Sequence, residues 1–207
     1  MPTDFGAKPQ LKTITVAHLK GGAAKTTTAG YLAHALQNMG HKVLAIDADP
    51  QGSLLRWSRR AKWSIPVRHL ATDHLDSDLA GMYTDDFDFV VIDTAPYDRG
   101  TVAAALRAAD TIVVTCPPNF EDVAQVKSTY ELIQREHPDA DIRVLLTRVD
   151  ARSVSPRFAR EAMTSGGRVV MKAEITARQQ LAQATATMPS PERGFGGYTG
   201  VALELLT

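Results

Sequence analysis

The stretch of sequence that decides the fold is His18–Ala29, HLKGGAAKTTTA. It begins where a short apolar run ends, and it leads into an amphipathic helical pattern. A strand, a turn of small residues and a helix N-terminus, in that order, form the context of a phosphate-binding loop. The ordinary loop, G-x-x-x-x-G-K-[ST], has two glycines. This chain has Leu19 and Ala24 at those two positions and carries an additional lysine, Lys20.

The loop offers the groups that bind the phosphates of a nucleotide. Its backbone N–H groups can converge on phosphate oxygens, and the dipole of the following helix favours their negative charge. We expect these contacts from Gly21, Gly22, Ala23, Ala24, Lys25 and Thr26. The Lys25 ammonium would reach the β and γ phosphates, and the Thr26 hydroxyl would ligate Mg²⁺. If the backbone at Ala24 requires positive φ, its methyl group costs about 1 kcal/mol or more.

Short apolar runs alternate with amphipathic stretches along the rest of the chain. Runs such as VVID, Val90–Asp93, are apolar on both faces, which is typical of parallel strands covered by helices on both sides. The expected strands are Lys12–His18, Val43–Asp47, Val67–Leu70, Phe87–Asp93, Thr111–Cys116 and Ile142–Thr147. The expected helices are Lys25–Met39, Ser53–Ala61, Val102–Ala108, Val123–Arg135, Pro156–Met163 and Ala177–Thr187. The pattern predicts an α/β fold with a single doubly wound, mostly parallel sheet and helices on both faces.

Length and composition limit the other possibilities. The 207 residues suffice for one α/β domain, expected over Leu11–Thr207 after a flexible polar tail, Met1–Gln10. The 23 Lys and Arg balance the 23 Asp and Glu, so binding to nucleic acid requires a local patch of charge. A single cysteine, Cys116, excludes a disulfide within the chain and a multi-cysteine metal site. No apolar signal segment or run of about 18 apolar residues is present, so we expect a cytoplasmic protein.

Two further strand ends carry carboxylates. Asp47 ends the second predicted strand, in AIDADPQGS, and Asp93 ends the fourth, in FVVIDTAP. In open parallel sheets ligands bind beyond the carboxyl ends of the strands, so both side chains should lie near the phosphate loop. Asp93 has the Walker B arrangement, in which an aspartate holds Mg²⁺ through water. The sequence therefore predicts a magnesium site formed by Thr26, Asp47 and Asp93.

The motifs resemble the deviant-Walker ATPases, the ParA/MinD family. That family's loop reads K-G-G-x-G-K-[ST]-[ST], which Lys20–Thr27 matches except at Ala24, and Asp47–Ser53 matches the family's D-x-D-P-Q-G-[SN] in full. The resemblance covers about residues 12 to 187 and implies ATP and Mg²⁺ as cofactors, with Thr27 among the nucleotide contacts. It also implies catalytic roles for three residues. Lys20 would cross a dimer interface to the partner's ATP, Lys25 would bind the phosphates and Asp47 would orient the attacking water.

Three further positions are candidates for binding the base of the nucleotide. Thr147 stands where the family often has an asparagine that touches adenine, and Pro118 and Asn119 resemble the other part of the adenine-binding wall. The run LLTRVD also resembles the T-K-x-D element by which GTPases read guanine, with Asp150 as the reader. The Asp47–Ser53 run belongs to ATPases and therefore favours ATP.

Within the family, the chain looks like the small ParA type. One cysteine excludes the iron–sulfur members, and no helix-turn-helix precedes the first strand. The last residues, TGVALELLT, contain no Lys or Arg, unlike a membrane-binding amphipathic helix, so we expect them to pack on the domain and expect no membrane partner. The stretch Pro189–Gly200 is expected to be a mobile loop before a short last helix.

This resemblance implies a weak ATPase that is stimulated by a partner. It would form an ATP-dependent homodimer on the nucleoid, bind DNA without sequence preference, and segregate a plasmid, chromosome or other large cargo with a ParB-like or adaptor protein. The basic C-terminal part of the chain supplies the candidate DNA contacts, namely Arg157, Arg160, Lys172 and Arg178. Two alternatives remain open, an ATP-dependent metabolic synthase or ligase and a nucleotide-binding scaffold with negligible hydrolysis.

Overall fold

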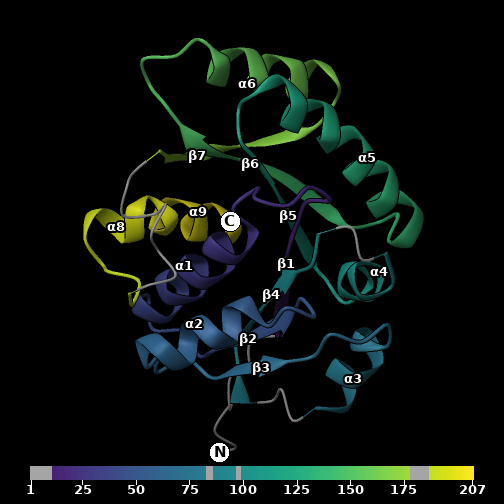
Figure 1. Ribbon diagram of the computed structural model, residues 1–207, viewed down its shortest axis with the longest axis vertical. Coiled ribbons are helices and arrows are strands. Elements are labelled where there is room, and N and C mark those ends of the chain that lie inside the picture. Colours follow the sequence, from purple (N-terminus) through teal and green to yellow (C-terminus); the bar gives the residue numbers. More distant parts are fainter. Residues whose placement is uncertain (1–10, 83–85, 97–98, 178–186) are drawn as a thin grey trace, which may run out of the picture.

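The computed structural model describes residues 11–82, 86–96, 99–177 and 187–207 (Figure 1). The strands of this part of the chain form one sheet of seven in the order β3-β2-β4-β1-β5-β6-β7, and every neighbouring pair is parallel. Their bounds are β1 (Lys12–Ala17), β2 (Val43–Ala48), β3 (Val67–His69), β4 (Phe89–Thr94), β5 (Thr111–Cys116), β6 (Asp141–Val149) and β7 (Val169–Thr176).

Helices cover both faces of the sheet (Figure 1). One face packs against α1 (Lys25–Asn38), α2 (Ser53–Ala61), α8 (Arg193–Gly196) and α9 (Tyr198–Leu205). The other packs against α3 (Leu75–Gly81), α4 (Arg99–Arg107), α5 (Phe120–Glu136) and α6 (Ser155–Ser165). All residues of β2 and β4 are buried, which explains why their sequences are apolar on both faces. The predicted doubly wound α/β fold is confirmed.

The register of the central strands places the predicted carboxylates together. Asp47 of β2 lies directly beside Asp93 of β4, and Asp93 lies beside Val16 of β1. All three strands end at this edge, and β1 continues from it into the phosphate-binding loop. Motifs that are far apart in the sequence therefore meet at one point of the sheet.

Close packing fixes α2 against α1. A Cβ atom at Gly30 of α1 would lie 2.5 Å from the Trp57 ring of α2, so only glycine leaves space for this side chain. Trp57 is fully buried, and its indole N–H donates to the Thr187 carbonyl at 2.7 Å. Burial of a large aromatic side chain on this scale contributes roughly 1.5–3 kcal/mol.

The structure also contains elements that the sequence pattern did not predict. The six predicted strands are present, but β7 was missed because it is an edge strand in which Met171 and Ile175 alone are fully buried. The short helix α3 was missed as well. Pro189–Gly200, predicted to be a loop, instead contains α8 and the beginning of α9. Residues 178–186 of the helix predicted over Ala177–Thr187 lie outside the described part of the chain.

The C-terminal helix packs on the sheet, as predicted. Tyr198 is fully buried, and its hydroxyl lies 3.0 Å from the Thr28 hydroxyl of α1. The Glu204 carboxylate accepts hydrogen bonds from the backbone N–H groups of Lys172 and Ala173 at 2.9 and 3.0 Å, which satisfies two donors of β7 where its pairing with β6 is irregular. None of the helices in the described residues combines the length and the apolar composition needed to span a bilayer.

Candidate nucleotide site

The loop between β1 and α1 contains two residues with left-handed backbone conformations. One of them is Ala24, which stands at a position where the ordinary loop has glycine. Gly22 has φ 77°, and Ala24, directly before α1, has φ 66°. A side chain in this region costs roughly 1–2 kcal/mol relative to glycine, so Ala24 is strained. The Lys25 side chain is buried, and its Nζ donates to the Lys20 carbonyl at 3.2 Å. Burial lowers the pKa of Lys25, and the carboxylates of Asp93 and Asp49 oppose that shift.

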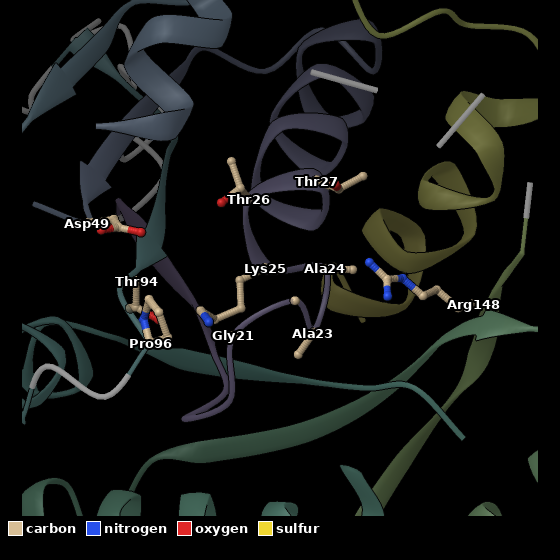
Figure 2. Close-up of a pocket in the computed structure, with 11 residues that line it drawn as sticks. Gly21, Ala23, Ala24, Lys25, Thr26, Thr27, Asp49, Thr94, Pro96 and Arg148 are labelled. Carbon is tan, nitrogen blue, oxygen red and sulfur yellow. The ribbon is translucent and has the colours of Figure 1, made fainter. Parts of the chain in front are cut away.

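A cavity of about 240 Å³ lies over this loop (Figure 2). Its walls are Gly21, Gly22, Ala23, Ala24, Lys25, Thr26, Thr27, Asp49, Thr94, Pro96 and Arg148. All of the predicted loop contacts from Gly21 to Thr27 therefore line one pocket. The volume is below the roughly 300–1,000 Å³ of a complete small-molecule pocket, so these walls form only part of a site for a ligand of that size.

Asp93 is fully buried at the end of β4, and neither of its carboxylate oxygens has a hydrogen-bond partner among the described residues. Burial, together with the nearby carboxylates of Asp47 and Asp49, raises the pKa of Asp93 to about 8. The hydroxyl of Thr26 and the ammonium of Lys25 oppose the shift, although Thr26 makes no well-formed hydrogen bond to Asp93. A buried carboxyl group without partners requires a cation or a proton.

The residues around Asp93 fit magnesium. Mg²⁺ prefers oxygen ligands and keeps several waters, so that one or two protein ligands and the substrate phosphates are sufficient. Thr26 and Asp93 offer oxygen atoms of this kind. The described residues contain no group of three or more His, Cys, Asp or Glu side chains that could hold a metal ion.

Asp47, the predicted catalytic carboxylate, is engaged in holding the turn after β2. It is fully buried, and it accepts hydrogen bonds from the backbone N–H groups of Asp49 at 3.2 Å and Leu55 at 2.8 Å. Burial raises the pKa of Asp47, and these two hydrogen bonds oppose the shift. Like Asp93, Asp47 is fully buried and absent from the pocket walls.

Asp49 faces the pocket instead, and the sequence prediction missed it. Side chains two residues apart lie on the same side of a strand. Asp49 follows the last residue of β2, so it lies beyond Asp47 at the carboxyl edge of the sheet. The D-x-D spacing together with the rule that ligands bind past the strand end could have identified it. Its Oδ1 accepts a hydrogen bond from the Gln51 N–H at 2.9 Å, which leaves the second oxygen for the pocket.

Lys20 lies outside the pocket and contacts α5 of its own chain. Its Nζ lies 2.9 Å from Asp122 Oδ1 and 3.2 Å from Glu121 Oε2, and hydrogen bonds to these two carboxylates raise the pKa of Lys20. Its backbone N–H donates to Nδ1 of His18 at 2.9 Å. Burial and the Lys25 charge lower the pKa of His18 to about 4, so this ring is neutral at pH 7 and accepts the bond.

Arg148 is a second pocket residue that the sequence prediction missed. It follows Thr147 near the end of β6, has φ 54°, and lies within an irregularity of the pairing between β6 and β7. Figure 2 shows its side chain extending toward Ala24. Its guanidinium forms no ion pair with any described residue, so it is available to a phosphate. Positive φ in a non-glycine residue beside a pocket often marks a functional residue. This feature is visible in the structure and not in the sequence, so sequence reasoning could not identify Arg148.

The predicted base-binding residues do not line this pocket. Thr147 is buried, and its hydroxyl has no partner among the described residues. Asn119 caps α5, because its Oδ1 accepts from the Asp122 N–H at 2.9 Å and its amide donates to the Asp122 carboxylate. Pro118 precedes that cap. Asp150, the alternative guanine reader, is paired with Arg152 through two N···O contacts of 3.1 Å.

The predicted DNA contacts are mostly paired with acids of the same chain. Arg157 Nε lies 2.8 Å from Glu161 on α6, and Arg160 lies 2.6 Å from Glu174 on β7. Lys172 is exposed on β7, and Arg178 lies outside the described residues. The structure therefore does not bring these side chains together as a patch of surplus positive charge.

The loop, the buried lysine and the two aspartates at adjacent strand ends define a P-loop nucleotide-binding protein. Residues 14–190 match the family model described as the CobQ/CobB/MinD/ParA nucleotide binding domain, and the chain belongs to this family. Its motifs and fold are those of the ParA/MinD P-loop ATPases.

Several named proteins are similar to this chain. The maintenance of carboxysome distribution protein A of Gloeobacter kilaueensis is 38% identical over 148 residues, which cover 69% of this chain and 66% of that protein. The chromosome partitioning protein ParA of Caulobacter vibrioides is 28% identical over 223 residues, which cover 84% of each chain. The structure of a plasmid partition protein of Borrelia burgdorferi bound to AMPPNP superposes with a TM-score of 0.79 at 20% identity, covering 95% of this chain and 99% of that one. This last likeness shows the fold.

Proposed function

We propose that this chain is a ParA-like positioning ATPase of the nucleoid. It binds ATP with Mg²⁺, forms a homodimer around the nucleotide, binds DNA without sequence preference and positions a plasmid, a chromosome or another large cargo. A ParB-like or adaptor protein stimulates hydrolysis and releases the DNA. The observation that carries the proposal is the pocket in which Gly21–Thr27 surround buried Lys25, beside the unpartnered carboxylate of Asp93. The carboxysome-distribution and chromosome-partitioning relatives support a positioning role.

The pocket residues divide the work of binding ATP. The N–H groups at the start of α1 and the Lys25 ammonium bind the β and γ phosphates, and Arg148 adds a guanidinium from the opposite wall. Thr26 and Asp93 hold the magnesium ion, which when bound neutralises charge on the phosphate oxygens. The geometry favours Asp49, rather than the predicted Asp47, as the carboxylate that orients the attacking water. Asp47 then acts as a positioning residue for the turn.

Lys20 connects the site to dimerisation. In the single chain its ammonium is held by Asp122 and Glu121. In the dimer it leaves these carboxylates and contacts the phosphates of the partner's ATP. Solvent screens the charge of the Lys20 ammonium in these ion pairs, so the lysine can exchange the two carboxylates for a triphosphate.

The switch is tested by measuring binding to random-sequence duplex DNA at two salt concentrations, with ADP or with ATP and Mg²⁺. The proposal predicts binding with ATP, loss of binding with ADP, and weakening at the higher salt concentration. Equal binding in both nucleotides would contradict it. The rate of ATP hydrolysis, measured with DNA and with an adaptor protein, is expected to rise only when both are present.

The synthase or ligase alternative is distinguished by the same hydrolysis assay. The matching family also includes CobQ and CobB by description, so a small-acid substrate deserves a direct test. A ligase would turn over ATP only with a small carboxylic acid and would be indifferent to DNA. The scaffold alternative, which strain at Ala24 favours, predicts nucleotide binding with no hydrolysis under any of these conditions.

A further inference from the structure

We propose that DNA binds to a surface of α2 and its C-cap, which we call the α2 basic surface, and not to the arginines of α6. The surface consists of Arg56, Arg59, Arg60 and Lys62, and all four side chains are exposed. The inference rests on the DNA-binding step of the proposed function and assigns its location.

The α2 basic surface carries positive charge that nothing nearby cancels. Between Ser53 and Pro66 the sequence has these four cations and no Asp or Glu. None of the four forms an ion pair with a residue that the structure describes, in contrast to Arg152, Arg157 and Arg160. Asp76 and Asp78 of α3 lie on the opposite face of the sheet. The charge therefore faces solvent unopposed.

The periodicity of α2 gathers three of these cations on its outer side. Leu54, Trp57 and Ser58 are buried and face the sheet. Arg56, Arg59 and Arg60 have the same i, i+3, i+4 spacing on the outer side. From Arg56 to Arg60 the helix advances about 6 Å. One strand of duplex DNA carries about two phosphates over that length, since the charges of each strand are roughly 3.4 Å apart. The three arginines can therefore neutralise the phosphates of a strand that they face.

Interaction with the helix dipole does not account for this set of cations. Basic residues in the last turn of a helix stabilise it by about 0.3–1 kcal/mol each, which applies to Arg59 and Arg60. Arg56 is in the first half of the helix. Positive charge at this position has no such benefit, but it extends the surface for a long polyanion.

The α2 basic surface is joined to the nucleotide pocket by a short chain of contacts. The Arg56 guanidinium donates to the Gln51 carbonyl and, at 3.3 Å, to the Ser53 hydroxyl. The Gln51 N–H in turn donates to Asp49, which lines the pocket. A change at Asp49 on ATP binding or hydrolysis would therefore reach α2 through two hydrogen bonds. This position suits a DNA-binding surface that responds to the nucleotide.

The test compares two double variants of the full chain that each remove two positive charges. Arg59→Ala with Arg60→Ala alters the α2 basic surface, and Arg157→Ala with Lys172→Ala alters the surface predicted from sequence. Binding to random-sequence duplex DNA is measured with ATP and Mg²⁺ at several salt concentrations. ATP binding and thermal unfolding of each variant establish that it is folded.

We expect the first variant to bind DNA at least tenfold more weakly at low salt. The slope of log K against log salt should fall in magnitude by about 2, because each lost phosphate contact removes about 0.9. The second variant should bind nearly as the unmodified chain does. Equal effects of the two variants, or a larger effect of the second, would overturn the assignment while leaving the DNA-binding function intact.

Two other outcomes concern the partner itself. If the unmodified chain binds and hydrolyses ATP but binds no DNA, the DNA-binding step of the proposed function fails and the assigned surface fails with it. If poly-L-glutamate competes as well as DNA of equal charge, the surface recognises an acidic polypeptide and the inference is wrong. If the unmodified chain does not bind ATP, the nucleotide assignment is wrong instead. The experiment therefore distinguishes failure of the assigned surface, of DNA binding and of ATP binding.

Discussion

At the scale of single residues, the site combines groups whose local free energies are unfavourable. Ala24 has a left-handed backbone that suits glycine, Asp93 is a buried carboxyl group without a hydrogen-bond partner, and Arg148 has positive φ and no ion pair with the described residues. Such features are retained where the surrounding structure and a ligand compensate for them. All three belong to the phosphate pocket or adjoin it, which agrees with a site completed by a polyphosphate and a divalent cation.

The strain at Ala24 leads to a direct prediction. Ala24→Gly should raise the free energy of unfolding by about 1 kcal/mol, because glycine adopts φ 66° without steric cost. The control is Ala23→Gly, a buried neighbour without positive φ, which should be destabilised by roughly 0.5–1 kcal/mol. Urea unfolding of both variants measures the effects, and ATP titration shows whether affinity rises with Ala24→Gly. If Ala24→Gly lowers the free energy of unfolding as much as Ala23→Gly does, Ala24 is not strained.

The raised pKa of Asp93 predicts how stability depends on pH. Its pKa is about 8 in the folded chain and about 3.8 without that environment, so between these values the folded state holds a proton that the unfolded state has lost. The contribution of Asp93 is therefore present at low pH and is lost as pH rises from about 4 to about 8. The slope is at most about 1.4 kcal/mol per pH unit.

That contribution is isolated by subtracting the unfolding free energies of Asp93→Asn from those of the unmodified chain between pH 5 and 7. The subtraction is needed because His18 contributes a pH dependence of stability with the opposite sign. The pKa of His18 is lowered to about 4, so its contribution to stability rises with pH. The difference should fall as pH rises without nucleotide, and ATP with Mg²⁺ should abolish the fall by supplying a cation to Asp93. A difference that stays constant or rises with pH would mean that Asp93 is ionised in the folded chain.

At the scale of elements, the sequence predicted the central structure well and its periphery poorly. Strands such as β2 and β4 are buried on both faces, so their apolar runs are unambiguous. The edge strand β7 and helix α3 bury few side chains, so neither has a clear apolar period. The phosphate loop and Asp93 were predicted because motif spacing determines them. Asp49 and Arg148 were missed because their role depends on which side chains reach the pocket beyond the strand ends.

The turn between β2 and α2 provides a test of the two aspartates. Asp49→Asn should lower the rate of ATP hydrolysis at least tenfold with little change in ATP affinity or stability, because an amide still accepts the Gln51 N–H. Asp47→Asn should lower the free energy of unfolding by about 1–3 kcal/mol, since one of its two backbone partners loses an acceptor. If Asp47→Asn stops hydrolysis in a fully stable protein while Asp49→Asn hydrolyses normally, the original prediction for Asp47 holds.

At the scale of the whole molecule, we propose a switch with three parts. ATP would fill the pocket at the carboxyl edge of the sheet, Lys20 would move from α5 to a second copy of the chain, and α2 would present positive charge to DNA. The first part rests on the pocket geometry, and the contacts of Lys20 with Asp122 and Glu121 define the starting point of the second. In this proposal, dimerisation on ATP links the pocket to the DNA.

The most direct test of this account is the molar mass in solution, measured by light scattering with ADP and with ATP and Mg²⁺. We predict a monomer with ADP and a dimer with ATP for the unmodified chain, and a monomer in both for Lys20→Ala, with ATP binding retained. The control, Lys127→Ala, removes an exposed lysine of α5 that pairs with Glu131 and should dimerise normally. An ATP-dependent dimer of Lys20→Ala as abundant as that of the unmodified chain, or no dimer of the unmodified chain with ATP, would contradict the account.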